Sequence, residues 1–460
     1  MPYSDIREFI ARLEQEGEIA HIKAEVDVNY ELGAVCYKAF NIPDPEKRKA
    51  LIFEKPKGHN VPIAVNLLGT RKRMCLALDT VPERFHGDWI ERAKNSIKPV
   101  VVESGPCHEK VYTGNDVDLT KFPVPIWNEK DGGPYITMPC WFAKDPETGW
   151  RNVGMYRCQV HDRKTVGIWA GPYRHINMQW RKAFAKGENF PVAIAIGPDP
   201  VVTIATIANC GYGEDEMNLA GALRGKPVDL VKCKTVPLEV PSTTEFVIEG
   251  WIKPGHMKQE GPYGEAYGYY GESNMREYVE ITAITHRNNP IHQASYLHRT
   301  PNEATFTRLP WEAEALVQYP TGGLISVNII DSVAIASIKK TYDGQGKMSG
   351  MGILGTTSGR LLKVIIIVDE DVNPYNLQDV MWAISSRCQP ERAVEIMKDI
   401  STAGIDPSIS EEHKRDKTSL TSKMIIDATK PVSRPFAEAV APQKEALARV
   451  EKEWEKYGIR

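Results

Sequence analysis

The sequence has no long hydrophobic run. Its most apolar segment, residues 361–368, contains a lysine and is far shorter than the roughly 20 residues that a helix needs to cross a bilayer. The first residues also lack the basic segment followed by an apolar run that is typical of a signal peptide. These absences predict a cytoplasmic protein with no membrane partner.

The sequence has no marked excess of charge of either sign. It contains 57 lysines and arginines against 60 aspartates and glutamates, which gives a formal net charge of −3. Proteins that bind nucleic acids usually carry a basic surface. The charge balance therefore argues against a broad interface of this kind, and we predict no nucleic-acid partner.

The sequence has eight cysteines, but they are scattered and none forms a Cys-x-x-Cys pair. Disulfide frameworks and structural zinc sites both use cysteines at close, recurring spacings. The scattering predicts reduced thiols in a cytoplasmic protein, not a disulfide framework or a zinc site.

The composition is that of a globular protein, with 42% hydrophobic and 25% charged residues. A length of 460 residues corresponds to roughly three domains. We predict the α/β (α+β) class, with a small α/β domain over residues 1–105. Residues 106–305 alternate short β-rich runs with Gly/Pro turns, which favours an antiparallel sheet or barrel. A second α/β domain is expected at 306–440.

Residues 441–460 are predicted to form a charged amphipathic helical tail. Such a tail can dock on a partner subunit or pack on its own chain, and its sequence is equally compatible with both.

Hydrophobic periodicity and turn residues predict the individual elements. The first helix is expected to have Ser4 as its N-cap and to end at Gly17. Further helices are expected at residues 30–40, 82–95, 178–186, 218–223, 311–318 and 376–386. Strands are expected at residues 19–24, 51–53, 61–65, 100–102, 135–138, 154–160, 166–169, 192–196, 201–207, 246–248, 324–330 and 362–368.

Residues 350–355, Gly-Met-Gly-Ile-Leu-Gly, match the G-x-G-x-x-G pattern of dinucleotide-binding folds. That function requires a strand directly before the glycines and a helix that opens on them. Residues 343–349 have no strand pattern, and the buried strand comes only afterwards. We therefore interpret the motif as a loop or as glycines that serve helix packing.

An acidic run, Asp369-Glu370-Asp371, directly follows the strand expected at 362–368. Carboxylates at the end of a strand can bind a cation. A solvated strand end or a helix-capping acid is the more frequent role of such a run, and we favour it here.

Two glutamates, Glu260 and Glu265, flank the sequence Gly-Pro-Tyr-Gly. On a regular strand they would point to opposite faces. Pro262 excludes a helix interior, and the Pro and Gly positions favour a tight turn. Such a turn can direct both carboxylates toward one pocket, where differing environments would suit acid–base chemistry. On spacing alone, a solvated surface turn is the more frequent outcome.

Three other segments of the central region supply an amide, an imidazole and a carboxylate: Asn152, His175 and Glu216. A ligand set of this kind, without a thiolate, suits Mn²⁺ or Mg²⁺ better than structural zinc. A hard ion could also bridge a cofactor phosphate. Strand alternation would place Asn152 and Arg157 on opposite faces, unless Gly154 marks a bulge.

The order and spacing of these motifs resemble the UbiD family of reversible decarboxylases, and the resemblance covers nearly the whole chain. The motifs that carry it are Asp131-Gly-Gly-Pro-Tyr-Ile-Thr137, Asn152-x-Gly-x-Tyr-Arg157, His175, Glu216 before Ala-Gly-Ala-Leu-Arg-Gly, Glu260-Gly-Pro-Tyr-Gly-Glu265, and the C-terminal segments 368–372 and 426–431.

The resemblance implies a prenylated FMN whose phosphate is held through Mn²⁺, with K⁺ nearby. It implies that a central split β-barrel carries the flavin, and that the metal ligands are Asn152, His175 and Glu216. The implied catalytic residues are Arg157, Glu260 and Glu265, with Glu265 as the proton donor. The implied flavin-binding residues are Thr137, Met155, Tyr156, Arg157, Trp169, Ala170, Gly171, Arg174 and His175.

The resemblance predicts a decarboxylase of an aromatic or heteroaromatic acid, first a phenolic acid and second an aryl dicarboxylate or its CoA thioester. The expected partners are that acid, CO₂, a flavin prenyltransferase that supplies the cofactor, and further copies of the chain in a dimer or hexamer. Arg174 would serve the flavin phosphate or a second anionic group of the substrate. The alternatives are an FMN-dependent oxidoreductase on a split barrel and a non-catalytic subunit of a multi-component decarboxylase.

Overall fold

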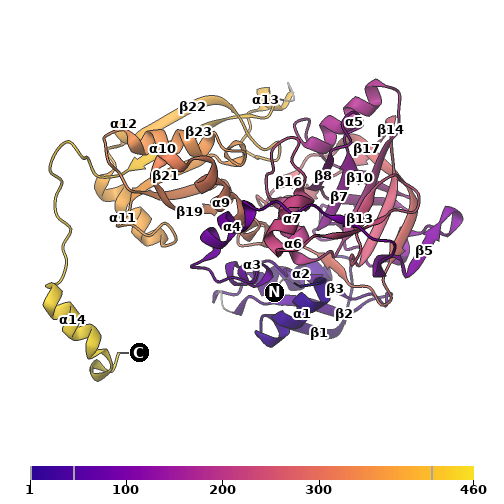
Figure 1. Cartoon of the computed structure of the whole chain (residues 1–460), viewed down its shortest axis with the longest axis horizontal. Coiled ribbons are helices and arrows are strands. Elements are labelled where there is room, and N and C mark those ends of the chain that lie inside the picture. The colour runs from indigo at the N-terminus through magenta and orange to yellow at the C-terminus, as the bar shows by residue number, and fades with distance from the viewer. Residues whose placement is uncertain (1–2, 45–46, 416–417, 460) are drawn as a thin grey trace.

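The computed structural model describes residues 3–44, 47–415 and 418–459, which form three packed units followed by a separate C-terminal helix (Figure 1). Each unit combines a sheet with helices, which confirms the predicted α/β (α+β) class. No helix in this described part is long and apolar enough to cross a membrane.

The N-terminal unit is a four-stranded sheet in the order β1-β2-β3-β18, covered by short helices. Its elements are α1 (Ile6–Gln15), β1 (Ile19–Val26), α2 (Glu31–Phe40), β2 (Ala50–Pro56), β3 (Ile63–Val65), α3 (Arg71–Ala77), α4 (Phe85–Ala93) and β18 (His292–Ala294). The predicted N-cap Ser4 is wrong by one residue. The carboxylate of Asp5 caps α1 by accepting hydrogen bonds from two backbone amides of the first turn.

The central unit is a curled sheet of nine strands in the order β6-β9-β10-β17-β14-β11-β7-β8, with β5 paired to β17. These strands are β5 (Lys110–Thr113), β6 (Tyr135–Ile136), β7 (Pro139–Lys144), β8 (Arg151–Met155), β9 (Cys158–Asp162), β10 (Thr165–Ile168), β11 (Phe190–Ile196), β14 (Phe246–Glu260) and β17 (Asn274–His286).

β8 is the last strand at one end of this sheet, and β9 is the second strand from the other end. Only Tyr156 and Arg157 lie between these two strands in the sequence. Three chain steps span at most about 11 Å. The two ends of the sheet must therefore lie side by side, although β8 pairs only with β7 in the described part of the chain. This curled but open sheet is the predicted split barrel, and we call the Tyr156–Arg157 junction the seam.

Helices and short strands cover the curled sheet. They are β4 (Val100–Val101), α5 (His175–Ala185), α6 (Pro200–Ile207), α7 (Glu216–Arg224), β12 (Asp229–Lys232), β13 (Glu239–Pro241), β15 (Tyr263–Gly264) and β16 (Tyr270–Gly271). The strand predicted at 201–207 is wrong, because this segment is α6. Asp199 caps this helix and Pro200 occupies its first turn. Nearly all of α6 is buried, so its sequence has no polar face to show the helical period.

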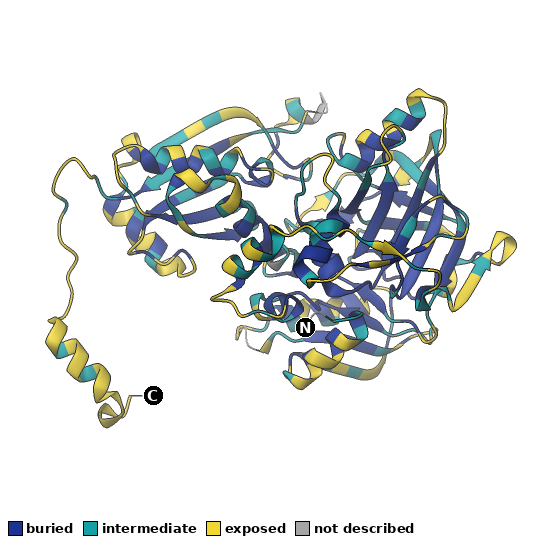
Figure 2. Cartoon of the chain, in the orientation of Figure 1, coloured by how far each residue is buried: buried dark blue, intermediate teal, exposed yellow. Residues whose placement is uncertain are grey.

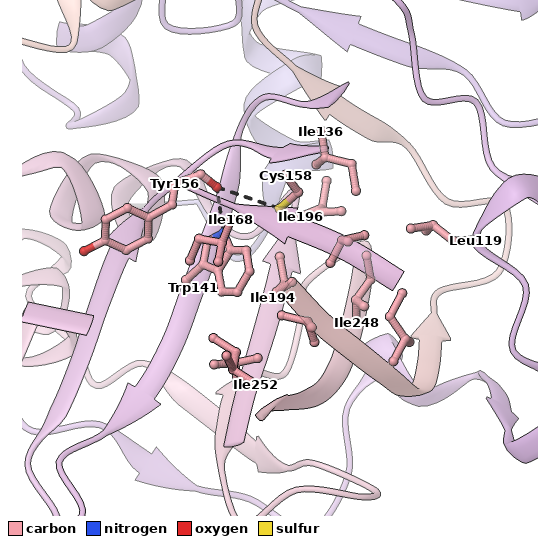
Figure 3. Close-up of a cluster of buried hydrophobic side chains, with 14 of the residues drawn as sticks. Leu119, Ile136, Trp141, Tyr156, Cys158, Ile168, Ile194, Ile196, Ile248 and Ile252 are labelled. Carbon is pink, nitrogen blue, oxygen red and sulfur yellow. Dashed lines mark hydrogen bonds between the residues drawn. The ribbon is translucent and has the colours of Figure 1, made fainter. Parts of the chain in front are cut away.

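The core of the central unit lies between the walls of the curled sheet, where buried isoleucines from several strands meet (Figure 3). Within it, the indole of Trp141 donates a hydrogen bond of 2.7 Å to the carbonyl of Tyr156. Both residues are buried. The core thus fixes the first residue of the seam, and Figure 2 shows that the surrounding strands are buried over most of their length.

The C-terminal unit is a five-stranded sheet in the order β19-β20-β21-β23-β22. Its elements are α8 (Glu303–Phe306), α9 (Leu309–Gln318), β19 (Leu324–Ile330), β20 (Val333–Ile338), α10 (Gln345–Leu354), β21 (Val364–Asp369), α11 (Leu377–Arg387), α12 (Pro390–Ala393), β22 (Val394–Ser401), α13 (Glu411–Arg415) and β23 (Leu420–Ala428).

The G-x-G-x-x-G segment lies in and just after helix α10, which contacts β21 and β23. A Cβ atom on Gly350 would lie 2.6 Å from Ile425, and one on Gly352 would lie 2.5 Å from the ring of Tyr319. These glycines therefore allow close packing of the helix, which is one of the two interpretations that the sequence left open.

The acidic run after β21 is neutralised by cationic side chains. Arg387 pairs with Asp369 at 2.6 Å and with Asp371 at 2.8 Å, and Lys430 pairs with Asp371 at 2.9 Å. The run is thus a strand end at which Asp369 and Asp371 are held by ion pairs.

The C-terminal helix α14 (Lys444–Lys452), with the 3₁₀ turn Trp454–Tyr457 behind it, stands apart from the three units at the end of an extended segment (Figure 1). None of its residues is buried. Within a single chain, the tail therefore does not pack on the folded units.

A leucine at Gly350 should lower the free energy of unfolding by about 1–3 kcal/mol, because overpacking a buried helix face forces its neighbours to move. Gly355→Leu is the control, since the nearest atom to its added Cβ is 3.4 Å away. Denaturant unfolding measures both variants. Unchanged stability of Gly350→Leu together with loss of binding to a nicotinamide dinucleotide would instead support the dinucleotide interpretation.

Candidate active site

The seam between β8 and β9 explains how the side chains of Asn152 and Arg157 can face the same site. The predicted continuous strand over 154–160 is wrong, because β8 ends at Met155 and β9 begins at Cys158. The pairing of β7 with β8 runs through Gly154 without a register shift, so Gly154 is not a bulge. Instead, the missing side chain of Gly154 leaves room for the ring of Tyr156, whose hydroxyl would lie 2.5 Å from an added Cβ.

A cavity of about 450 Å³ lies at the seam, within the usual range for cofactor and substrate sites. It is lined mainly by residues from the central unit and also by residues of the C-terminal unit, among them Trp311, Thr357, Arg360 and Ile405. The predicted site residues that line it are Thr137, Asn152, Met155, Tyr156, Arg157, Trp169, Arg174, His175, Glu216 and Glu265. The predicted residues Glu260, Ala170 and Gly171 do not line it.

Arg157 holds two carboxylates at the cavity wall. Its Nε and Nη2 donate to the two oxygens of Glu260 at 3.0 and 3.1 Å, and its Nη1 donates to Glu265. The guanidinium also lies over the ring of Tyr263, 4.9 Å from its centre. The hydroxyl of Tyr135 donates to Glu260 at 3.3 Å. All three charged side chains are almost fully buried.

Burial and the neighbouring charges set the protonation of this group. Burial raises the pKa of Glu265, the guanidinium of Arg157 opposes the rise, and the carboxylate of Glu260 adds to it. Burial alone would lower the pKa of Arg157, but the two carboxylates raise it, so the guanidinium stays charged. Glu265 is therefore biased toward its neutral form in contact with a fixed cation.

The Gly-Pro-Tyr-Gly turn is held by the Asp131–Gly132 segment and by Gln159. The backbone amide of Gly261 donates to Gln159 at 2.9 Å, and that of Gly264 donates to Asp131 at 2.9 Å. Gly132 donates to the carbonyl of Pro262 at 2.8 Å. Gly261 has a φ of 91°, which favours glycine.

The turn brings Glu260 and Glu265 to the same guanidinium, as the sequence suggested, but not to the same pocket. Glu265 faces the cavity, whereas Glu260 lies behind Arg157. The expectation that both carboxylates face one pocket is therefore wrong. Glu260 is the last residue of β14, and Glu265 follows the short strand β15, so the turn places them on either side of the arginine.

Two of the three predicted metal ligands are the first residues of helices that line the cavity. His175 begins α5 and Glu216 begins α7, while Asn152 lies on β8. Glu216 is 4% exposed, and burial raises its pKa to about 8. Burial lowers the pKa of His175, which favours the neutral imidazole that a metal requires. The amide nitrogen of Asn152 is buried without a partner.

This donor set fits a hard divalent cation. Glu216 is a buried carboxylate that accepts a hydrogen bond of 2.8 Å from the backbone amide of Val153. No described cationic side chain pairs with it, so an added cation would remove the cost of ionising it. The described residues contain no group of three or more His, Cys, Asp or Glu side chains suited to a metal, and here an amide completes the set.

Two arginine side chains on the cavity wall carry positive charges that suit the binding of an anionic group. Arg174 and Arg360 both line the cavity, and neither forms an ion pair with a carboxylate in the described residues. The Nη1 atom of Arg360 is buried without a partner, and its guanidinium lies 4.0 Å from the centre of the Tyr173 ring. Sequence reasoning missed Arg360, because no local motif marks it and only the packing of the C-terminal unit brings it to the cavity.

Tyr173 connects the cavity to the C-terminal unit. Its hydroxyl donates to the carbonyl of Thr402 at 3.4 Å and accepts from the amide of Gly404 at 3.1 Å. The loop between β10 and α5, which carries Trp169 and Arg174, is therefore held by both units.

Glu265→Gln should change how stability depends on pH. A raised native pKa means that the wild-type native state binds this proton more tightly than the unfolded chain, so wild-type stability falls as pH rises from about 4.5 through the native value. The Gln variant lacks this fall, and its melting temperature should gain on the wild type over that range. Differential scanning fluorimetry between pH 4.5 and 8.5 measures the effect, with the exposed Glu272→Gln as the control. A difference that does not vary with pH would contradict the environment described for Glu265.

Comparisons with known proteins agree with this architecture. Models of the 3-octaprenyl-4-hydroxybenzoate carboxy-lyase family match residues 10–93 (N-terminal domain), 98–300 (Rift-related domain) and 327–428 (C-terminal domain). The phenolic acid decarboxylase of Bacillus subtilis is 36% identical over 477 residues, which cover 99% of this chain and 98% of that protein.

Solved structures show the same similarity over nearly the whole chain. The vanillic acid decarboxylase of Sedimentibacter hydroxybenzoicus in closed form has a TM-score of 0.89 and 33% identity, with 99% of this chain and 100% of that chain covered. An evolved dimeric form of the UbiD-class enzyme HmfF from Pelotomaculum thermopropionicum, in complex with prFMN, has a TM-score of 0.83 and 32% identity, with 96% and 97% covered. This chain therefore belongs to the UbiD family of carboxy-lyases.

Proposed function

We propose that the protein is a reversible, non-oxidative decarboxylase of an aromatic or heteroaromatic carboxylic acid, with prenylated FMN as its cofactor. The observation that carries this proposal is the buried Arg157 between Glu260 and Glu265 at the wall of a cofactor-sized cavity. A phenolic acid is the first candidate substrate, since relatives named for phenolic and vanillic acids match the whole chain. An aryl dicarboxylate or its CoA thioester is the second.

The reaction exchanges a carboxylate for a proton on an sp² carbon, with release of CO₂. The carbon that loses CO₂ has no adjacent group that accepts the electron pair, and the bound cofactor supplies that electron sink. Arg157 can hold the substrate carboxylate at the cavity wall. Glu265, biased toward its neutral form, can then give its proton to the carbon.

We further propose that Asn152, His175 and Glu216 hold Mn²⁺, which binds the flavin phosphate, with K⁺ nearby. Arg174 and Arg360 add positive charge to the same wall and would serve the phosphate or a second anionic group of the substrate. The side chains of Thr137, Met155, Tyr156 and Trp169 are available at the cavity surface for the flavin. Ala170 and Gly171 would contribute through the loop that they form.

The proposal also covers the C-terminal tail, the oligomeric state and the source of the cofactor. Helix α14 and the 3₁₀ turn behind it have no buried residue in the single chain, and they expose apolar side chains such as Leu447 in the helix and Trp454 in the turn. This supports a homo-oligomer, as a dimer or hexamer, in which the tail packs on another copy. A separate flavin prenyltransferase would supply the cofactor.

Glu265→Gln should abolish CO₂ release from phenolic acids, a loss of at least about 100-fold, because a glutamine cannot donate a proton to carbon. Headspace CO₂ and product formation by the cofactor-loaded enzyme measure this, with Glu272→Gln as an active control. Flavin content by absorbance should stay unchanged. A largely active Glu265→Gln protein would favour the alternative of an FMN-dependent oxidoreductase, which has no need of this carboxyl group.

Glu216→Gln should weaken Mn²⁺ binding and, with it, the affinity for FMN, because the amide keeps the shape of the side chain but cannot neutralise a cation. Metal content by mass spectrometry and FMN fluorescence quenching test this without any turnover. Glu214→Gln, two residues earlier on the exposed loop, is the matched control. Equal metal content in both variants would contradict the proposed ligand set.

A non-catalytic subunit of a multi-component decarboxylase is the other alternative. The loaded chain alone would then release CO₂ from no acid, and adding a second component would restore activity. Activity of the purified chain by itself would exclude this role.

A further inference from the structure

Lys423 is a charged residue buried inside the C-terminal unit. It lies on β23, between β21 and β22 in the sheet (Figure 1), and is only 1% exposed. No carboxylate pairs with it in the described part of the chain, and burial together with the charge of Arg360 lowers its pKa to about 8. A buried charge without a counterion is costly to fold. Packing of the sheet therefore does not by itself account for a lysine at this position.

The ammonium group of Lys423 holds the turn that carries Arg360. Its Nζ atom donates to the carbonyl of Gly359 at 2.8 Å and to the carbonyl of Arg360 at 3.0 Å. Both residues belong to the 3₁₀ turn Gly359–Leu361. On the other side of this turn, the hydroxyl of Ser358 accepts a hydrogen bond of 2.9 Å from the side-chain amide of Asn209, a residue of the cavity wall. The turn is thus tied both to the C-terminal sheet and to the cavity.

The guanidinium of Arg360 is directed at the cavity from this turn. It lies 4.0 Å from the centre of the Tyr173 ring, and its Nη1 atom is buried without a partner. Arg174 lines the same wall, and its positive charge adds to burial in lowering the pKa of Arg360. Two neighbouring cations without a carboxylate partner among the described residues suit an anionic oxygen group, which a guanidinium binds by charge-assisted hydrogen bonds.

We propose that Lys423 is a positioning residue that fixes the turn Gly359–Leu361, so that Arg360 can bind an anionic oxygen group in the cavity. This inference rests on the proposed function, since it takes the cavity as the site of cofactor and substrate. The phosphate of the flavin and a second carboxylate of the substrate share the required chemistry. Without the ammonium group, the two carbonyls lose their donor and the turn no longer holds the guanidinium over Tyr173.

The test compares Lys423→Met and Arg360→Met with the matched control Lys340→Met. Lys340 lies just after β20 of the same sheet, and its side chain is 8% exposed. It also donates to a backbone carbonyl, that of Lys430, at 2.8 Å. The control therefore removes the same charge and the same kind of hydrogen bond from the same unit, but from a residue that does not line the cavity or hold Arg360.

Binding of FMN and of riboflavin in the presence of Mn²⁺, followed by flavin fluorescence, tests the phosphate as the anion. Lys423→Met and Arg360→Met should each weaken FMN binding by about tenfold or more and leave riboflavin binding unchanged. If the anion belongs to the substrate, FMN binding stays at the wild-type level, and the FMN-loaded variants lose affinity for benzene-1,3-dicarboxylate but not for benzoate. Lys340→Met should match the wild type in both assays.

The double variant separates positioning from a general loss of structure. Because Lys423 acts through Arg360, the double variant should lose no more affinity than Arg360→Met alone. Lys423→Gln keeps a donor for the carbonyls and should retain more affinity than Lys423→Met. It also decides the question if Lys423→Met fails to fold.

Wild-type affinities for FMN and for the dicarboxylate in both Lys423 variants, or additive losses in the double variant, would overturn the inference. None of these assays needs turnover. A wild-type protein that binds flavin, with no effect of Lys423, leaves the proposed function intact, because Glu265→Gln tests that function separately. A wild-type protein that binds neither FMN nor an aromatic acid contradicts the proposed function itself.

Discussion

The buried ion pair between one guanidinium and two carboxylates is the constraint on which the rest of the site depends. Removing one partner of such a group leaves an uncompensated charge in the interior, at a cost of about 3–5 kcal/mol. Several hydrogen bonds from the surrounding fold accordingly hold this group in place. Trp141 fixes the carbonyl that precedes Arg157, Gln159 and Asp131 fix the turn, and Tyr135 donates to Glu260.

The position of Arg157 follows from the topology of the central sheet. A nine-stranded sheet that curls but does not close has two ends, and here only two residues join one end strand to the strand beside the other end. Arg157 thus lies where the backbone leaves the hydrogen-bonded ladder of the sheet, so the side-chain alternation of a strand no longer applies to it. Asn152, the second residue of strand β8, and Arg157 can both face the same cavity for this reason.

Much of this arrangement could be predicted from the sequence, and the failures have physical causes. Hydrophobic patterning predicted an α/β region, a β-rich region and a second α/β region, and the motifs predicted that Arg157, Glu260 and Glu265 come together, as they do. The strand over 154–160 was wrong because alternation cannot show a two-residue break, and α6 was missed because a fully buried helix has no polar face. Arg360 could not be found, since only the packing of the C-terminal unit brings it to the cavity. Spacing alone also could not show that Glu260 lies behind the arginine.

The most direct test of the central claim, that this group protonates a carbon held against a prenylated flavin, is exchange of the product in D₂O. Purified, cofactor-loaded protein is incubated with a panel of phenols and other aromatic products, and the bound flavin is identified by mass spectrometry. The account predicts prenylated FMN and deuterium at the single carbon that would carry the carboxylate. Unmodified FMN together with no exchange on any compound would contradict it.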